Sequence, residues 1–183
     1  MTILILRAGR PMAAAILIAG LAFAPLACKR HPRVTVQTEE EGPLLATIVH
    51  VADPRASAQL LSGFYGVEQN SWRWTAGKFS VVLRPPRTAA AKGATLQLKF
   101  TVPEVVIAKL KAMSLSASVN GIPLSPESYT LPGEFTYTRD VAANLLAGES
   151  AKVDFSLDKT MPPSGSDERE LGVVVSSVGL EPK

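Results

Sequence analysis

Apolar and polar residues alternate with a period of two over several stretches of the chain. The clearest is ATLQLKFTV, residues 94–102, in which leucine, phenylalanine and valine alternate with threonine, glutamine and lysine. Because successive side chains of a strand point to opposite faces, this pattern predicts a half-buried strand. The same alternation predicts strands over 114–120 and 152–158. Further strands are expected over residues 45–51, 78–83, 135–141 and 173–180.

Turn residues separate these stretches, and Asn120-Gly121 between two apolar alternations is a strong hairpin signal. Only residues 103–113 show a helical pattern, with a proline at the start and Val106, Leu110 and Met113 on one face, so a helix of one or two turns is expected there. Seven or eight short antiparallel strands at this spacing predict an all-β fold, a single jelly-roll-like antiparallel β-sandwich over residues 44–183.

The first 27 residues have the pattern of an export signal. Arg7 and Arg10 precede an apolar run, residues 12–27, and the single cysteine, Cys28, follows it directly. The stretch Pro25-Leu26-Ala27-Cys28 resembles a bacterial lipoprotein signal, although such signals usually have leucine three residues before the cysteine. The resemblance implies a signal peptide over 1–27, lipidation of Cys28, and a lipid-anchored protein of the cell envelope whose partner is the membrane.

Residues 28–43 are polar, lack an apolar period and contain three consecutive glutamates, so a flexible, disordered tether is expected between a signal helix and the sandwich. Once Arg7 and Arg10 are removed with the signal, basic and acidic residues nearly balance. A nucleic-acid partner, which needs a concentrated basic face, is therefore not expected. Lys29, Arg30 and Arg33 either add attraction to an anionic membrane or belong to a merely solvated tether.

Groups that could perform catalysis are few. His31 lies in the tether, and His50 lies between two valines of an expected strand. One cysteine and two histidines exclude a Cys/His metal centre, and no cofactor is expected. The carboxylates that follow PPSGS are typical of a solvated loop. Asp53, Asp154 or Asp158 could supply oxygen ligands to a structural calcium, but their spacing is unlike that of a dedicated calcium-binding loop. We therefore expect a protein that is not an enzyme.

Both tryptophans of the chain lie in SWRWT, residues 71–75. If this stretch is extended, Trp72 and Trp74 point to one face and Arg73 to the other. Two exposed rings with polar neighbours would form a stacking platform for sugars. Two buried rings would instead close the end of the sandwich, and composition alone favours this second interpretation.

A set of short motifs along the domain resembles a small β-sandwich module that occurs at the end of bacterial glycosyltransferases and methyltransferases, and alone in envelope proteins. The motifs are Gly63-Phe64-Tyr65, Glu68, Trp72-Arg73-Trp74-Thr75, Val119-Asn120-Gly121, and the late Asp167, Arg169, Leu171 and Gly172. The resemblance implies a carbohydrate-binding-type sandwich without catalytic residues, in which the tryptophan stretch and the late motif meet in space. An arginine stacked on a tryptophan and paired with Glu68 or Asp167 would explain that meeting as structure alone.

These observations favour a non-catalytic envelope lipoprotein that binds a glycan or envelope polysaccharide. The expected ligand-binding residues are Tyr65, Glu68, Trp72, Arg73, Trp74, Asp167 and Arg169. The alternative is a lipoprotein that interacts with other envelope proteins and keeps its tryptophans in the core.

Overall fold

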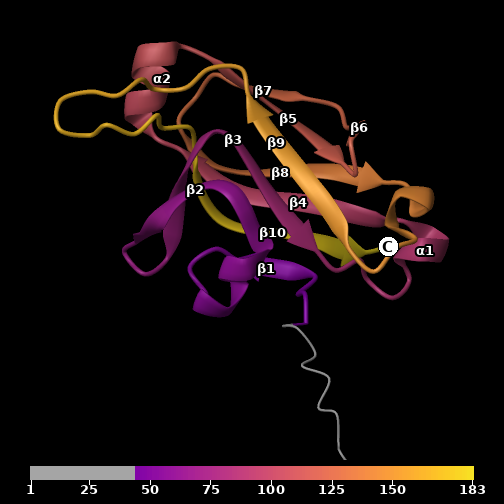
Figure 1. Cartoon of the computed structure of the whole chain (residues 1–183). Coiled ribbons are helices and arrows are strands. Elements are labelled where there is room, and N and C mark those ends of the chain that lie inside the picture. Colours follow the sequence, from indigo (N-terminus) through magenta and orange to yellow (C-terminus); the bar gives the residue numbers. More distant parts are fainter. Residues whose placement is uncertain (1–43) are drawn as a thin grey trace, which may run out of the picture. The chain divides into compact units, whose positions relative to one another are not determined.

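The computed structural model of the chain describes residues 44–183. The expected signal peptide, Cys28 and the tether lie outside the described residues. The described part is mostly β-structure (Figure 1), with strands β1 (Ile48–His50), β2 (Leu60–Glu68), β3 (Trp72–Leu83), β4 (Ala94–Val102), β5 (Met113–Val119), β6 (Ile122–Pro123), β7 (Glu127–Tyr129), β8 (Gly133–Val141), β9 (Ala151–Leu157) and β10 (Val174–Pro182). Short helical segments join them: η1 (Pro54–Gln59), α1 (Ala89–Lys92), α2 (Glu104–Leu110) and η2 (Ala143–Leu146). No helix within residues 44–183 has the length and hydrophobicity needed to cross a membrane.

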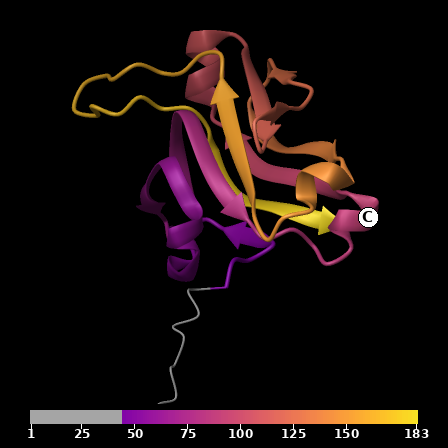
Figure 2. The ribbon, with the colours of Figure 1, turned by 45° about the vertical axis from the view of Figure 1, so that its right-hand side comes forward.

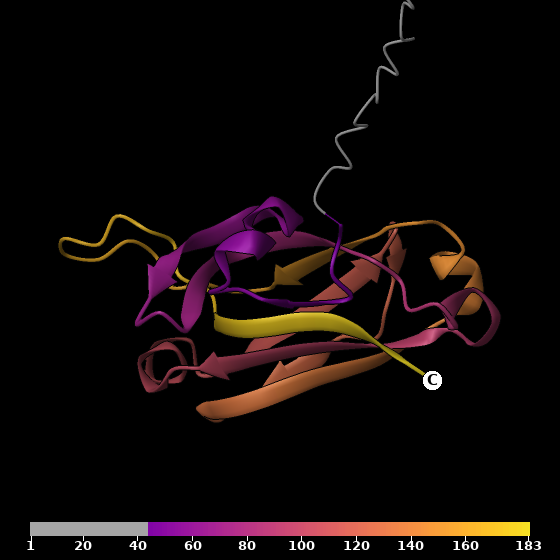
Figure 3. The same cartoon turned by 90° about the horizontal axis from the view of Figure 1, so that it is seen from below.

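The strands form a curled antiparallel sheet in the order β6-β5-β9-β3-β10-β4-β8, with β1 added to β10, β2 to β3, and β7 to β5. β3 belongs to both halves of this sheet. Its Arg73 and Trp74 pair with β10, whereas the stretch from Lys78 to Leu83 pairs with β9. A first layer therefore consists of β10, β4, β8 and β1, and a second layer of β2, β9, β5 and the later half of β3; Figure 3 shows β10, β4 and β8 side by side.

The predicted alternation fills the space between the layers, which confirms the β-sandwich. In β4 the even-numbered apolar residues are buried, and every second residue of β5 and β9 is buried in the same way. Phe79 of β3 stacks on Phe155 of β9 with ring centroids 4.9 Å apart, and both rings are almost wholly inaccessible to solvent. Burial of these apolar side chains is the main stabilising contribution to such a fold.

Some predicted bounds were wrong. β1 covers only Ile48–His50 of the expected 45–51, β3 begins at Trp72 and not at residue 78, and β2 was not predicted. The alternation of β2 is interrupted because its register against β3 shifts three times, and Gly63 has a positive φ of 74° at one shift. A β-bulge of this kind breaks the period of two on which strand prediction relies. The short helix was predicted correctly, since α2 lies within 103–113 and buries Val106.

The long loop between β9 and β10, residues 158–173, is held together by bridges between Met161 and Leu171 and between Ser164 and Asp167. It projects from the domain at the end opposite the C-terminus (Figures 1 and 2). The base of this β9–β10 loop is joined to β3 next to Trp74: the Gly172 amide donates to the Thr75 carbonyl at 2.7 Å. Two segments about a hundred residues apart in sequence thus meet beside the tryptophans.

Candidate functional site

Trp72 and Trp74 lie on the outer side of the first layer. Trp74 is the register partner of Val174 on β10, and Val174 is the register partner of Thr101 on β4. Residues in register share a face of the sheet, and Thr101 lies on the face of β4 that is opposite to the buried Phe100. The two indole rings meet edge to face with centroids 6.4 Å apart. Both side chains are half-buried, and Trp74 packs against the core. Trp74 therefore contacts the core, while Trp72 borders an open surface.

That surface is a groove of about 450 Å³ across the outer side of the first layer. Trp72 forms one wall, and the side chains that continue it across β10, β4 and β8 are mostly polar: Ser176, Lys99, Thr101, Glu134 and Thr136. No hydrogen bond or ion pair within residues 44–183 uses the Lys99 ammonium or the Glu134 carboxylate. The groove thus offers an aromatic surface beside polar groups that are free to contact a ligand.

A tight turn places Glu68 beside Trp72. Gln69 and Asn70 both have positive φ, and the Ser71 amide donates to the Glu68 carbonyl at 3.1 Å. Such a turn joins neighbouring antiparallel strands and sets their register, here Glu68 opposite Trp72. Side chains of directly opposite residues lie on the same face, with Cβ atoms roughly 5 Å apart. Glu68 and Trp72 are therefore opposite residues whose side chains leave the hairpin on the same face.

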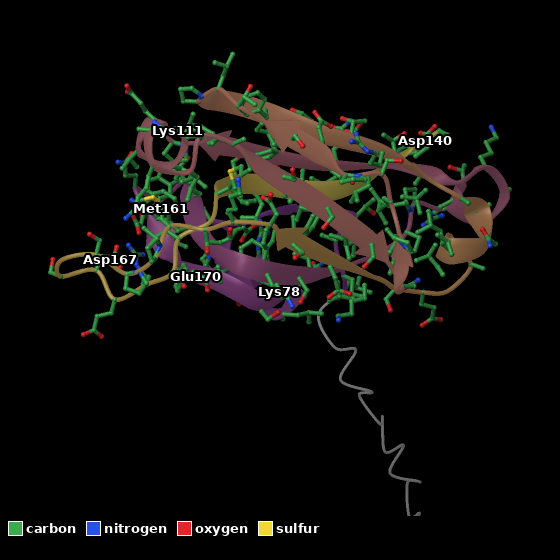
Figure 4. All side chains as sticks on the ribbon, turned by 90° about the horizontal axis from the view of Figure 1, so that it is seen from above. Lys78, Lys111, Asp140, Met161, Asp167 and Glu170 are labelled. Carbon is green, nitrogen blue, oxygen red and sulfur yellow. The ribbon has the colours of Figure 1, made fainter. Side chains whose placement is uncertain are left out.

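Arg169 of the β9–β10 loop holds two carboxylates at once. Its Nε and Nη2 donate to the two oxygens of Asp167 at 2.9 and 2.8 Å, and its Nη1 donates to Oε1 of Glu68 at 2.9 Å. Figure 4 shows Asp167 out on this loop and Glu170 and Met161 nearer its base. The predicted meeting of the late motif with the tryptophan stretch is therefore present in the structure.

The cation-π contact in this cluster has a different partner from the one predicted. The Arg169 guanidinium carbon lies 5.3 Å from the centroid of the Tyr65 ring, not over a tryptophan. Tyr65 is also tied to the loop, because its hydroxyl donates to the Glu170 carbonyl at 2.8 Å. The reason is positional: Trp72 lines the groove and Trp74 packs against the core, whereas Tyr65 on β2 is bonded to the loop.

Arg73 points away from the groove. Its Nε donates to the Val51 carbonyl at 2.7 Å and its Nη1 to the Tyr65 carbonyl at 2.8 Å. It lies on the opposite side of β3 from the two tryptophans, as alternation predicts. Its guanidinium joins β3 to Val51 and to β2 and does not line the groove.

The Arg169 cluster has a clear electrostatic signature. Hydrogen bonds from the Arg169 side chain and backbone lower the pKa of Asp167 to about 2, and the two carboxylates raise the pKa of Arg169. All three side chains remain between 34% and 38% exposed, so the solvent weakens each ion pair. The cluster is suited to orienting side chains near the surface and has no strongly buried charge.

Three aspartates elsewhere in the domain are used structurally. Asp53 pairs with Arg55, which lowers its pKa, Asp154 pairs with Lys152, and Asp158 accepts the Ser114 amide. Within residues 44–183 no three acidic, histidine or cysteine side chains are grouped to hold a metal ion. His50 is exposed on β1, opposite Ser177 of β10.

A second groove, of about 310 Å³, lies on the outer side of the second layer. Its charged residues are Lys78 and Asp154. Its floor is formed by serines of four strands: Ser62, Ser80, Ser116, Ser118 and Ser156. Several of these polar groups satisfy one another, as in the 2.8 Å contact between the Ser62 and Ser80 hydroxyls. No aromatic platform was expected there from the sequence, and the tryptophans lie on the other layer.

Sequence reasoning missed the polar lining of the tryptophan groove. Lys99 and Thr101 stood out as members of the outward set of β4, but nothing in the sequence connected them to Trp72. Glu134 and Thr136 belong to the expected strand that became β8. The missing information was the order of strands, which places β10 and β4 between β3 and β8.

No known protein family and no protein of curated function matches this sequence. Several solved structures are similar in fold. An acetyl xylan esterase from the rumen bacterium Butyrivibrio proteoclasticus is similar with a TM-score of 0.45 and 11% identity over 76% of this chain and 33% of the esterase chain. The chain thus spans about a third of the esterase.

Two smaller structures match over most of their own length. The CBM36-1 domain of a multidomain xylanase from the hindgut metagenome of Trinervitermes trinervoides has a TM-score of 0.41 and 12% identity, over 75% of this chain and 97% of that domain. A family 35 carbohydrate binding module from an environmental isolate has a TM-score of 0.37 and 13% identity, over 79% and 90%. At such low scores and identities, these likenesses carry no argument about a ligand or an activity.

Proposed function

We propose that the protein binds a glycan or envelope polysaccharide, without catalysis, in the groove beside Trp72. The observation that carries this proposal is one groove of about 450 Å³ that combines a half-buried indole ring with charged groups that no residue of the described part of the chain engages. A flat ring suits the C–H surface of a sugar, and groups such as the Lys99 ammonium and the Glu134 carboxylate can hydrogen-bond its hydroxyls.

Tryptophan fluorescence of the purified protein tests this proposal. Trp74→Phe leaves Trp72 as the sole tryptophan and keeps an aromatic ring against the core. Iodide should quench this variant, and a binding polysaccharide should protect it. The matched control, Trp72→Phe, leaves Trp74 as the reporter, and we expect a much smaller response from it.

Calorimetry with the same polysaccharides supplies an independent measurement. Trp72→Ala should weaken binding about tenfold or more, since truncation of a central tryptophan is typically among the costliest changes at a binding site. Ser116→Ala, on the outer side of the second layer, should leave affinity unchanged. If no neutral or acidic polysaccharide binds or protects Trp72, the proposal fails and the protein-interaction alternative is favoured.

We further propose that the protein is a lipoprotein of the cell envelope, anchored through Cys28. The support is the sequence pattern around Cys28, which lies outside the described residues. Metabolic labelling with an alkyne-tagged fatty acid should label the natural protein and not Cys28→Ser. Equal labelling of both, or labelling of neither, would contradict the anchor.

A further inference from the structure

The charges around Trp72 bear on which glycans this groove can hold. The groove runs from Trp72 on β3 to Lys99 on β4 and Glu134 on β8. Glu68 on β2 is not among its lining residues but is the register partner of Trp72 at its edge. Arg169 adds one positive charge at the β2 end, but Asp167 and Glu68 together more than neutralise it. The face therefore has a carboxylate at each end and a small excess of negative charge.

Only one of the two oxygens of the Glu68 carboxylate is hydrogen-bonded to another described residue. Its Oε1 accepts from Arg169, whereas no hydrogen bond within residues 44–183 uses its Oε2. The side chain is 37% exposed, and its register partner is Trp72. An ionised carboxylate is a strong acceptor for hydroxyl donors. Glu68 is therefore placed to accept a hydrogen bond from a sugar that stacks on Trp72.

Arg169 restricts where this carboxylate can point. Asp167 accepts hydrogen bonds from both Nε and Nη2, and these two bonds fix the plane of the guanidinium group. The direction in which Nη1 donates to Glu68 is thereby fixed as well. A carboxylate held in advance loses less side-chain entropy when a ligand binds. This geometry gives the cluster a use beyond fastening the β9–β10 loop.

Resting on the proposed function above, we infer that the groove recognises an uncharged, hydroxyl-rich glycan chain, with Trp72 supplying a stacking surface and Glu68, held by Arg169, supplying a hydrogen-bond acceptor next to it. Glu68 contacts the ligand, and Arg169 is a positioning residue. An acidic polysaccharide would bring like charge against Glu68 and Glu134, which disfavours binding.

Matched polymers test the ligand class. Mannan, β-1,3-glucan and dextran would each be titrated in neutral form and after carboxymethylation, at low and at moderate salt. We expect the best neutral polymer to bind about tenfold or more tightly than its carboxymethylated form at low salt, and the difference to shrink as salt screens the repulsion. Glu134→Gln should narrow the same difference. Equal or tighter binding of the carboxymethylated form would overturn the inference.

A double-mutant cycle tests the roles of Glu68 and Arg169. Glu68→Ala should weaken binding of the neutral polymer about tenfold. Arg169→Lys should have a similar effect, because one ammonium cannot reproduce the planar fork that holds Asp167 and Glu68 together. If Arg169 acts through Glu68, the double variant should be no weaker than either single variant, which a purely structural role would not predict.

The outcomes separate this inference from the proposed function. Binding that is lost in Trp72→Ala but unchanged in Glu68→Ala would overturn the role of Glu68 and leave the groove as a glycan site. Fully additive losses in the double variant would overturn the positioning role of Arg169. Absence of any polysaccharide binding would overturn the proposed function and the inference together. Thermal unfolding of each variant shows whether a loss of affinity reflects a loss of folded protein.

Discussion

The outer sides of the two layers carry grooves of similar size but different chemistry. The groove on the first layer has the Trp72 ring and the charges of Lys99 and Glu134, with which no other residue of 44–183 pairs, whereas the groove on the second layer has a floor of serines. In the serine groove the hydroxyls of Ser62 and Ser80 bond each other, and the Ser116 hydroxyl donates to a carbonyl of β9. The difference teaches that the backbone supplies a groove, and that unsatisfied polar groups beside an exposed ring make it a candidate binding site.

The core beneath the serine groove should be the most sensitive place in the domain. Phe155→Ala removes one ring of the buried stack with Phe79, and such truncations typically cost about 3 to 5 kcal/mol. Because β3 joins the two layers, we expect both outer sides to lose their structure together. Denaturant unfolding measured by circular dichroism would show it. A variant that remains as stable as the natural protein would contradict this account of the core.

Substitution of the two neighbouring tryptophans should lower the stability of the domain by different amounts. Trp74→Ala should destabilise the domain by about 2 kcal/mol or more, because this ring packs against the core. Trp72→Ala should cost clearly less, since its ring borders the groove. Chemical unfolding of the two variants side by side measures the difference. Equal costs would mean that both rings serve the core, and the contrast between the two outer sides would disappear.

The serine groove should tolerate loss of its internal contacts. Ser80→Ala removes the hydrogen bond to Ser62, and a bond of this kind is worth about 1 kcal/mol. The Ser62 hydroxyl is exposed and can turn to water, so the observed cost should lie at or below that value. The midpoint of urea unfolding measures it. Loss of glycan affinity in Ser80→Ala would show that this groove, and not the one at Trp72, is the site.

The Arg169 cluster should make the stability of the domain depend slightly on pH. The folded-state pKa of Asp167 is lowered to about 2 from its ordinary value of 3.8, chiefly by the Arg169 side chain. The stabilisation is therefore complete above the ordinary pKa and is lost as the pH falls from about 4 towards 2. Melting temperatures of the natural protein and of Asp167→Asn should converge over that interval. A constant gap between them would exclude this ion pair as the source.

Much of the fold could be predicted because alternation is local. The pattern in residues 94–102 predicted β4, and the patterns over 114–120 and 152–158 predicted β5 and β9 to within one residue at each end. β2 escaped because Gly63 and the register shifts break the period on which the prediction rests. The prediction also placed the start of β3 at residue 78, six residues later than its actual start at Trp72.

The candidate site was only partly predictable. The sequence placed Trp72 and Trp74 on one face with Arg73 on the other, and the resemblance placed the late motif near them. It could not separate the two rings, one of which packs against the core while the other borders the groove. Nor could it show that Arg169 stacks on Tyr65, because that depends on where the β9–β10 loop meets β2.

The sequence by itself determined which side chains face outward, since a strand alternates them with a period of two whatever its neighbours are. It also determined a β-sandwich, because enough strands with one apolar face must bury those faces against each other. Only the tertiary structure decided that Glu68, Trp72, Lys99 and Glu134 share one face. Strand order is set by contacts between residues far apart in the chain, and a local period of two does not encode it.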